Sequence, residues 1–154
     1  MEYFDMKLEA APLEQIANEW EKDSKMDTTE PGKEMVRVPI LHNKYNRFLS
    51  AHNLAAKKAI IELNKMRKLK WMYYNGKLSQ EELDKYGWEQ FPFTLKQDLN
   101  VYLDGDEDMA KLQAKKSYHE EAANYCIYVM KELNNRTWQL KEYMSWEKFI
   151  HGAH

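Results

Sequence analysis

The chain has 154 residues, of which 44% are hydrophobic and 31% are charged, so it predicts one folded domain rather than a disordered segment. Only five glycines and four prolines interrupt it, which favours long helices over turn-rich sheets. We expect no membrane span, because no apolar run reaches about 18 residues. We also expect no secretory signal, because the N-terminal stretch MEYFDMKLEAAPLEQ has neither a basic nor an apolar region of the kind that a signal requires. The single cysteine, Cys126, cannot form an internal disulfide and predicts a reducing, cytoplasmic environment.

Positive charge is concentrated in one segment, although the net charge is only −2. Residues 39–75 hold eight Lys and Arg against one Glu, whereas the flanking segments 1–38 and 76–124 are acidic. Such a separation indicates a partner that carries negative charge. We expect a single domain made of an acidic N-terminal segment with a short helix (1–38), a basic amphipathic helix (39–75), an aromatic arm with an acidic connector (76–108) and a C-terminal oligomerisation helix (109–154).

Proline positions and apolar spacing predict the first two helices. Leu13 to Trp20 can form a short helix, because the proline before them suits a first helical turn. The Pro31-Gly32 pair indicates a turn, and Pro39 marks the start of a long helix. From there a stripe recurs at steps of three and four residues, which is typical of an amphipathic helix. Its members are Leu41, Tyr45, Phe48, His52, Ala56, Ala59, Leu63 and Met66.

A second arc of this helix, roughly 100° wide, carries positive charge. It contains Arg47, Lys57, Lys58, Lys65 and Lys68. In the stretch KMRKLKWMYYNGKL (65–78) the apolar stripe and the basic residues overlap. Lys70 occupies the position where the apolar stripe should continue, and Arg67 turns towards the same side. Gly76 predicts the end of the helix. Basic residues in a last turn also suit the helix dipole, but a dipole accounts for one or two cations and not for eight.

The region after this helix predicts a short helix and a packed aromatic arm. Ser79, with Glu82 three residues later, forms a capping box at a helix start. The acidic run DGDED at 104–108 lacks the Gly and Glu positions of a calcium-binding EF-hand loop. We therefore interpret it as N-capping carboxylates for the next helix. The aromatic residues that we expect to be packed are Tyr86, Trp88, Phe91 and Phe93.

The last predicted helix runs from Met109 to near Ile150, and Asn134-Asn135 can interrupt it. Its apolar stripe contains Tyr118, Ala122, Tyr125, Val129, Leu133, Arg136, Leu140, Tyr143 and Ile150. Trp138, Trp146 and Phe149 lie off the centre of this stripe, so more than one face is apolar. We expect the additional face to bind another subunit. The residues predicted to form this oligomerisation surface are Tyr143, Trp146, Phe149 and Ile150.

No motif of the sequence indicates catalysis. The five histidines lack the spacing of metal ligands, and no phosphate-binding glycine loop or nucleophile motif occurs. We expect His52 to be a hydrogen-bonded histidine of the core or of an interface, and Cys126 to be a buried thiol. The sequence therefore predicts a protein that is not an enzyme, with no catalytic residues, no metal site and no cofactor.

Cations beside aromatic rings favour single-stranded nucleic acid, because cations follow the phosphates and bases stack on the rings. Double-strand readout is disfavoured, since no helix-turn-helix pattern appears. We expect Tyr74 in the core, because it falls on the apolar arc. The residues alone leave a second hypothesis open, namely an oligomeric helical scaffold or adaptor whose basic face binds an acidic protein. The candidate DNA-binding residues are Lys57, Lys58, Lys65, Arg67, Lys68, Lys70, Trp71 and Tyr73.

Four segments resemble the UvsY-like recombination mediators of T-even-type bacteriophages and their marine relatives. They are EWEKDSKMD (19–27), KLKWMYYNG (68–76), LKQDLNVYLDGDEDMAKL (95–112) and NNRTWQLKEYMSWEKFIHG (134–152). They follow one another in the family's order and cover most of residues 18–152.

The resemblance implies a largely α-helical protein in a homo-oligomeric ring, a hexamer or heptamer. It implies binding to single-stranded DNA and loading of a RecA-like phage recombinase onto DNA covered by the phage single-strand-binding protein, in recombination and repair. Lys68 and Lys70 would contact DNA, and the C-terminal helix would drive assembly. The implied location is the cytoplasm of the infected host cell, with no membrane partner.

Overall fold

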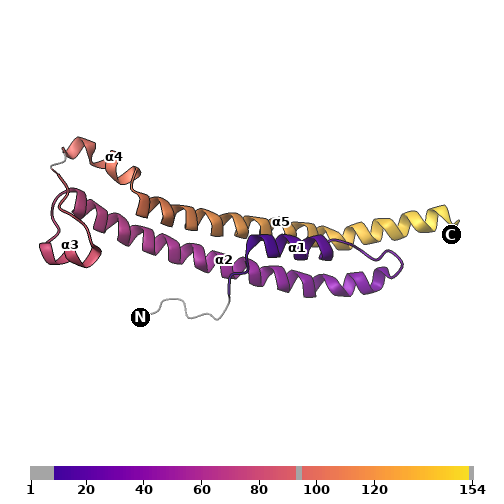
Figure 1. Ribbon diagram of the computed structural model, residues 1–154. Helices are drawn as coiled ribbons and strands as arrows, with labels where there is room; N and C mark the ends of the chain where they lie inside the picture. Colours follow the sequence, from indigo (N-terminus) through magenta and orange to yellow (C-terminus); the bar gives the residue numbers. More distant parts are fainter. Residues whose placement is uncertain (1–8, 93–94, 153–154) are drawn as a thin grey trace. The chain divides into compact units, whose positions relative to one another are not determined.

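The computed structural model describes residues 9–92 and 95–152, and all regular secondary structure in these residues is helical. Figure 1 shows the elements in chain order. They are α1 (Leu13–Asp23), α2 (Pro31–Tyr74), α3 (Gln80–Tyr86), the short 3-10 helix η1 (Lys96–Asp98), α4 (Leu99–Asp104) and α5 (Glu107–Ile150). The predicted all-α class is confirmed. Phe93 and the first eight residues of the acidic N-terminal segment lie outside the described residues.

The chain divides into two compact units, and the two long helices contribute to both. Unit 1 consists of Met1–Leu54 and His119–His154, and unit 2 consists of Ala55–Tyr118. That the chain acts as a single domain stays a prediction. No helix among residues 9–92 and 95–152 has the length and apolar character that a membrane span requires.

α2 begins eight residues earlier than the sequence predicts. It starts at Pro31 and continues through Pro39, so the expected turn at Pro31-Gly32 is wrong. Both prolines suit a helix start, because a first turn needs no N–H from proline. The additional turns are anchored by Glu34, whose carboxylate accepts a hydrogen bond from the backbone N–H of Asp27 at 3.2 Å. Pro39 is exposed, so the helix tolerates the loss of one N–H donor there.

α5 is a single helix of 44 residues, so the predicted interruption at Asn134-Asn135 does not occur. Both asparagines are exposed, and the residues on either side of the pair, Leu133 and Arg136, are buried. This burial holds the helix continuous across the pair. The predicted N-capping role of the acidic run is confirmed, because a carboxylate oxygen of Asp106 accepts from the N–H of Met109 at 3.0 Å.

The arm between the long helices contains one predicted helix and two that the sequence analysis missed. The capping box of α3 is confirmed, since the Ser79 hydroxyl accepts from the N–H of Glu82 and the Glu82 carboxylate accepts from the N–H of Ser79. Gly87 ends α3 in the left-handed region with φ 68°, where a side chain would be strained. η1 and α4 occupy the segment that was interpreted as a connector.

The core of unit 1 forms where α1, the first part of α2 and the last part of α5 meet. Its buried members are Ile16, Leu41, Tyr45, Cys126, Val129 and Leu133. Burial raises the pKa of the Cys126 thiol to about 11. The predicted core histidine is confirmed, because His52 is fully buried. Its Nε2 lies 2.7 Å from the carbonyl oxygen of Ala11, and its Nδ1 lies 3.0 Å from Nδ1 of His119.

Two charged residues of the same unit, Asp23 and Arg136, form polar contacts at the C-terminal end of α1. The Asp23 carboxylate accepts from Arg37, Lys44 and the Tyr45 hydroxyl. Burial acts against its charge, but the partners outweigh it and lower the pKa of Asp23. Nη2 of Arg136 donates to the carbonyl oxygen of Asp23 at 2.9 Å. A cation at this position satisfies a carbonyl at the C-terminus of α1 and suits its dipole.

Candidate nucleic-acid interface

Five of the predicted basic side chains are exposed on the part of α2 that belongs to unit 2. None of the five forms an ion pair or hydrogen bond with another side chain in the part of the protein that the structure describes. Because α2 is unbroken here, its four lysines stay within an arc roughly 100° wide and the arginine lies outside it. Uncompensated cations on one helix face attract an anionic ligand. We call the five exposed cations together the basic face; they are Lys57, Lys58, Lys65, Arg67 and Lys68.

Trp71 follows Lys68 by three residues and so lies on the same side of α2. Its side chain is 41% exposed. Nζ of Lys77 lies 4.4 Å from the centroid of its ring. The indole therefore presents a flat face next to positive charge, which is the arrangement on which nucleic-acid bases stack. Its contact with DNA stays a prediction.

Lys70 is buried, in contrast to Lys68 two residues before it. Its Nζ lies 3.0 Å from a carboxylate oxygen of Asp106 and 2.8 Å from one of Asp108. The ring centroid of Trp88 is 4.2 Å from the same nitrogen. The structure thus places Lys70 in the interior of unit 2, contrary to the expectation of an exposed cation that reaches DNA. The reason is positional, because residue 70 continues the apolar stripe and turns inward with it.

The pKa values of this buried pair move in the direction that keeps both groups charged. Burial acts against the Lys70 ammonium, but hydrogen bonds with Asp108 and Asp106 outweigh it and raise the pKa of Lys70. Burial also acts against the charged form of Asp106. Hydrogen bonds from Tyr74, the Met109 N–H and Lys70 nevertheless lower the pKa of that carboxyl. Asp106 therefore caps α5 and holds the end of α2 at the same time.

Tyr73 and Tyr74 are half-buried members of an aromatic cluster in unit 2. The Tyr73 hydroxyl donates to the carbonyl oxygen of Glu89 at 3.0 Å, and its ring lies 5.0 Å from that of Trp88. Tyr73 is thus engaged within the protein, where the sequence predicts a DNA contact. The Tyr74 hydroxyl donates to Asp106 at 2.7 Å, and its ring meets that of Phe91 edge to face at 4.8 Å. The position of Tyr74 on the inward face agrees with its prediction as a packed residue.

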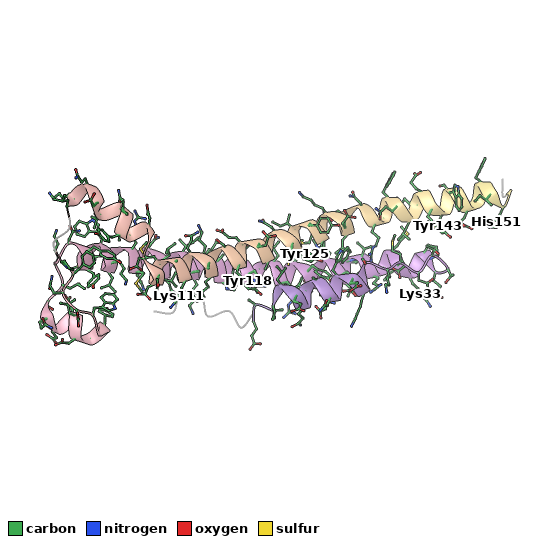
Figure 2. The ribbon with its side chains drawn as sticks, turned by 45° about the horizontal axis from the view of Figure 1, so that its top comes forward. Lys33, Lys111, Tyr118, Tyr125, Tyr143 and His151 are labelled. Carbon is green, nitrogen blue, oxygen red and sulfur yellow. The ribbon has the colours of Figure 1, made fainter. Side chains whose placement is uncertain are left out.

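The predicted oligomerisation residues lie at the end of α5, which Tyr143 and His151 mark in Figure 2. Tyr143 is half-buried. The exposed fractions are 57% for Trp146, 84% for Phe149 and 49% for Ile150. Three large apolar side chains within two turns form an exposed surface that favours association. A ring of subunits stays a prediction.

Within the described residues, no group of three His, Cys, Asp or Glu side chains is placed to hold a metal ion. The acidic run at 104–108 is engaged otherwise, since Asp106 and Asp108 pair with Lys70.

The sequence matches one protein family over most of its length. Residues 19–153 match the model of the family described as "Recombination, repair and ssDNA binding protein UvsY". The chain belongs to the UvsY family. The resemblance seen in the four segments is therefore confirmed. No curated protein matches the sequence significantly. The UvsY description names recombination, repair and DNA binding and names no catalytic reaction.

The fold is that of UvsY in solved structures. The crystal structure of the bacteriophage T4 recombination mediator protein UvsY in lattice type II matches with a TM-score of 0.78 and 19% identity, over 92% of this chain and 98% of that chain. The same protein in lattice type I matches with a TM-score of 0.76 and 18% identity, over 88% of this chain and 98% of that chain. At this identity the UvsY structures establish the fold.

Proposed function

We propose that the chain binds single-stranded DNA through the exposed face of α2 and acts as a recombination mediator. The observation that carries this proposal is the match to the UvsY family over residues 19–153. The basic face of unit 2 supplies a physical means, because its five cations have no counter-ions within the described residues. Cations of this kind track the sugar-phosphate backbone of a strand and release its condensed counterions.

The DNA-binding residues divide into two groups with different tasks. Lys57, Lys58, Lys65, Arg67 and Lys68 contact phosphates, and Trp71 stacks on a base. Lys70 and Tyr73 support the surface from within, because both are engaged by other residues of unit 2. Their effect on DNA binding is therefore indirect.

As a mediator the protein loads a RecA-like phage recombinase onto single-stranded DNA that is covered by the phage single-strand-binding protein. It does so by binding and without a catalytic step, in homologous recombination and repair. Subunits associate into a hexamer or heptamer through Tyr143, Trp146, Phe149 and Ile150, so that several weak sites act on one strand. The protein works in the cytoplasm of the infected host cell.

The DNA-binding part is tested with a fluorescent poly-dT oligonucleotide at several salt concentrations. The double substitution Lys57→Ala and Lys58→Ala should weaken binding and make its salt dependence shallower, by about 0.7 in the slope of log K against log salt for each lost phosphate contact. The matched control is Lys131→Ala with Lys141→Ala, two exposed lysines of α5, which should change neither quantity.

The mediator part requires the RecA-like recombinase and the single-strand-binding protein of a T-even-type bacteriophage. Adding the chain should speed the formation of recombinase filaments on DNA that the single-strand-binding protein already covers. A wild-type protein that binds an acidic polypeptide but no oligonucleotide would instead favour the scaffold or adaptor hypothesis, and this proposal would be wrong.

A further inference from the structure

Unit 2 contains an apolar groove beside the basic face, with a volume of about 560 Å³. The half-buried side chains of Met66, Leu69 and Met72 from α2 and Leu112 from α5 line it, and Tyr86 of α3 adds an exposed aromatic ring. A volume of this size is typical of sites for small molecules. The groove is therefore large enough for flat chemical groups that insert from a polymer on the surface.

The rim of the groove is positively charged. Lys65 and Lys68 lie on it and are exposed, with no ion partner among residues 9–92 and 95–152. Glu62 is the acidic residue of the lining, and Nζ of Lys115 neutralises it at 3.2 Å. A ligand that fits both features has apolar, planar groups and carries negative charge beside them.

We propose that this groove receives the nucleobases of single-stranded DNA, while Lys65 and Lys68 hold the flanking phosphates; this inference rests on the proposed function. The two methionines favour bases of any identity, because a thioether is flexible and polarisable and makes favourable contacts with aromatic rings. The Tyr86 ring stacks on Trp88 with one face, at a centroid distance of 4.8 Å, and offers its other face to a base. A protein that binds single strands of any sequence requires such a sequence-tolerant site.

The groove also accounts for a preference between single and double strands. Phosphates are present in both, so the basic face alone attracts either. In a duplex the bases are stacked and paired inside, and extracting one has a free-energy cost. Only a single strand offers its bases to the groove without this cost. The apolar lining and the stacking on Trp71 therefore determine the preference for single strands, and the lysines determine the salt dependence.

The test compares three oligonucleotides of equal length: poly-dT, an abasic strand with the same phosphates, and a duplex. The wild-type protein should bind poly-dT about tenfold more tightly than the abasic strand, since a bound base contributes a factor of this order. The double substitution Met66→Gln and Met72→Gln, which keeps side-chain length and removes apolar character, should reduce this difference to the part that stacking on Trp71 contributes. Binding to the abasic strand and to the duplex, and the salt slope, should stay as in the wild type.

The matched control is Met35→Gln, which alters a half-buried methionine of α2 in unit 1 and should leave all three affinities unchanged. Circular dichroism reports whether the double variant folds. If it does not fold, photocrosslinking of the wild type with 5-iodouracil in the strand decides, and the label should appear on Met66, Met72 or Tyr86 of the groove in addition to any label on Trp71.

An unchanged preference for poly-dT in the folded double variant would overturn the groove and leave the proposed function intact. A label confined to residues outside the groove would do the same. Equal wild-type affinity for poly-dT and the abasic strand would overturn both the groove and the stacking on Trp71, and would leave the phosphate contacts of the lysines intact. Failure of the wild type to bind any oligonucleotide would overturn both the groove and the proposed function. These outcomes separate the two proposals.

Discussion

Lys68 and Lys70 are two residues apart on one helix, and the structure gives them opposite environments. Lys68 is exposed and unpaired among the described residues, whereas Lys70 is buried between two carboxylates and an indole ring. An α-helix turns by about 200° over two residues, so neighbours of equal charge face opposite sides. A run of cations in a sequence therefore indicates a ligand-binding surface only for those cations that face outward on the helix.

The same division applies to the aromatic residues of the segment. Trp71 lies on the outward side with Lys68, while Tyr73 and Tyr74 pack with Trp88 and Phe91. The outward face is a candidate for binding, and the inward face holds the end of α2 to the arm. Mutations on the two faces should accordingly change different measured quantities.

The largest expected effect is on the inward face. Lys70→Met should lower the free energy of unfolding by about 3–5 kcal/mol, because it leaves two carboxylates near the interior without their cation. Urea denaturation followed by circular dichroism measures this loss. Lys68→Met is the matched control and should stay within about 0.5 kcal/mol of the wild type. Equal stabilities of the two variants would contradict the contrast between the two lysines.

The second effect concerns assembly, through the exposed end of α5. Removing residues 142–154 should give smaller assemblies in light scattering, because the exposed Trp146, Phe149 and Ile150 are lost. DNA affinity should then fall on the order of 100-fold, since linked sites gain from effective concentration. An unchanged assembly would contradict the assignment of this surface and place the subunit interface elsewhere.

The third effect separates stacking from charge. Trp71→Ala should reduce the binding of single-stranded DNA by about 1–3 kcal/mol, with little change in the salt slope, if a base stacks on the indole. Fluorescence titration at two salt concentrations measures both quantities. Trp138→Ala removes another exposed tryptophan, which lies on α5, and should leave the affinity unchanged when light scattering shows that the assembly is the same as in the wild type.

A smaller effect is expected for a single outward lysine. Lys68→Ala should reduce the salt slope by about 0.7 for each phosphate contact that it removes, and alanine keeps the helix intact. The same titration with Lys131→Ala supplies the baseline for an exposed lysine outside the face. A normal slope for Lys68→Ala would move the phosphate contacts to Lys57, Lys58 and Lys65.

The smallest expected effect is a pH dependence of the Lys70 contrast. Burial acts to raise the pKa of Asp106, but the hydrogen bonds from Tyr74, the Met109 N–H and Lys70 outweigh it. The pKa therefore lies below its ordinary value of 3.8. Such a group contributes stability above the unfolded pKa and loses it as the pH falls through the folded value. The difference in unfolding free energy between the wild type and Lys70→Met should therefore narrow below about pH 3.8. A difference that is constant down to pH 2 would contradict the pairing with Asp106.

The sequence predicted the features that depend on interactions between residues close to one another in the chain. Three-and-four spacing predicted both long helices, and Ser79 with Glu82 predicted the start of α3. The outward position of the lysines followed from the helical period alone. The sequence also showed that position 70 is unusual, because Lys70 places a charge on the apolar stripe.

Long-range partners could not be predicted from the same signals. Asp106 pairs with Lys70, although the arm separates the two residues in the sequence. No periodicity relates two positions that are so far apart in the chain. The acidic run was interpreted only as a helix cap, because capping is local and ion pairing is not. The start of α2 was missed for a similar reason, since Glu34 and Arg37 stabilise its first turns through contacts with Asp27 and Asp23.

The buried state of Cys126 has a practical consequence for spectroscopy. A thiol with a pKa of about 11 and no exposed surface stays protonated and shielded near neutral pH, and a maleimide reacts with the accessible thiolate. It is the only cysteine in the sequence. A cysteine introduced at the exposed Ser145 would thus accept a single fluorophore on the native background, and energy transfer between labelled subunits would report their association directly.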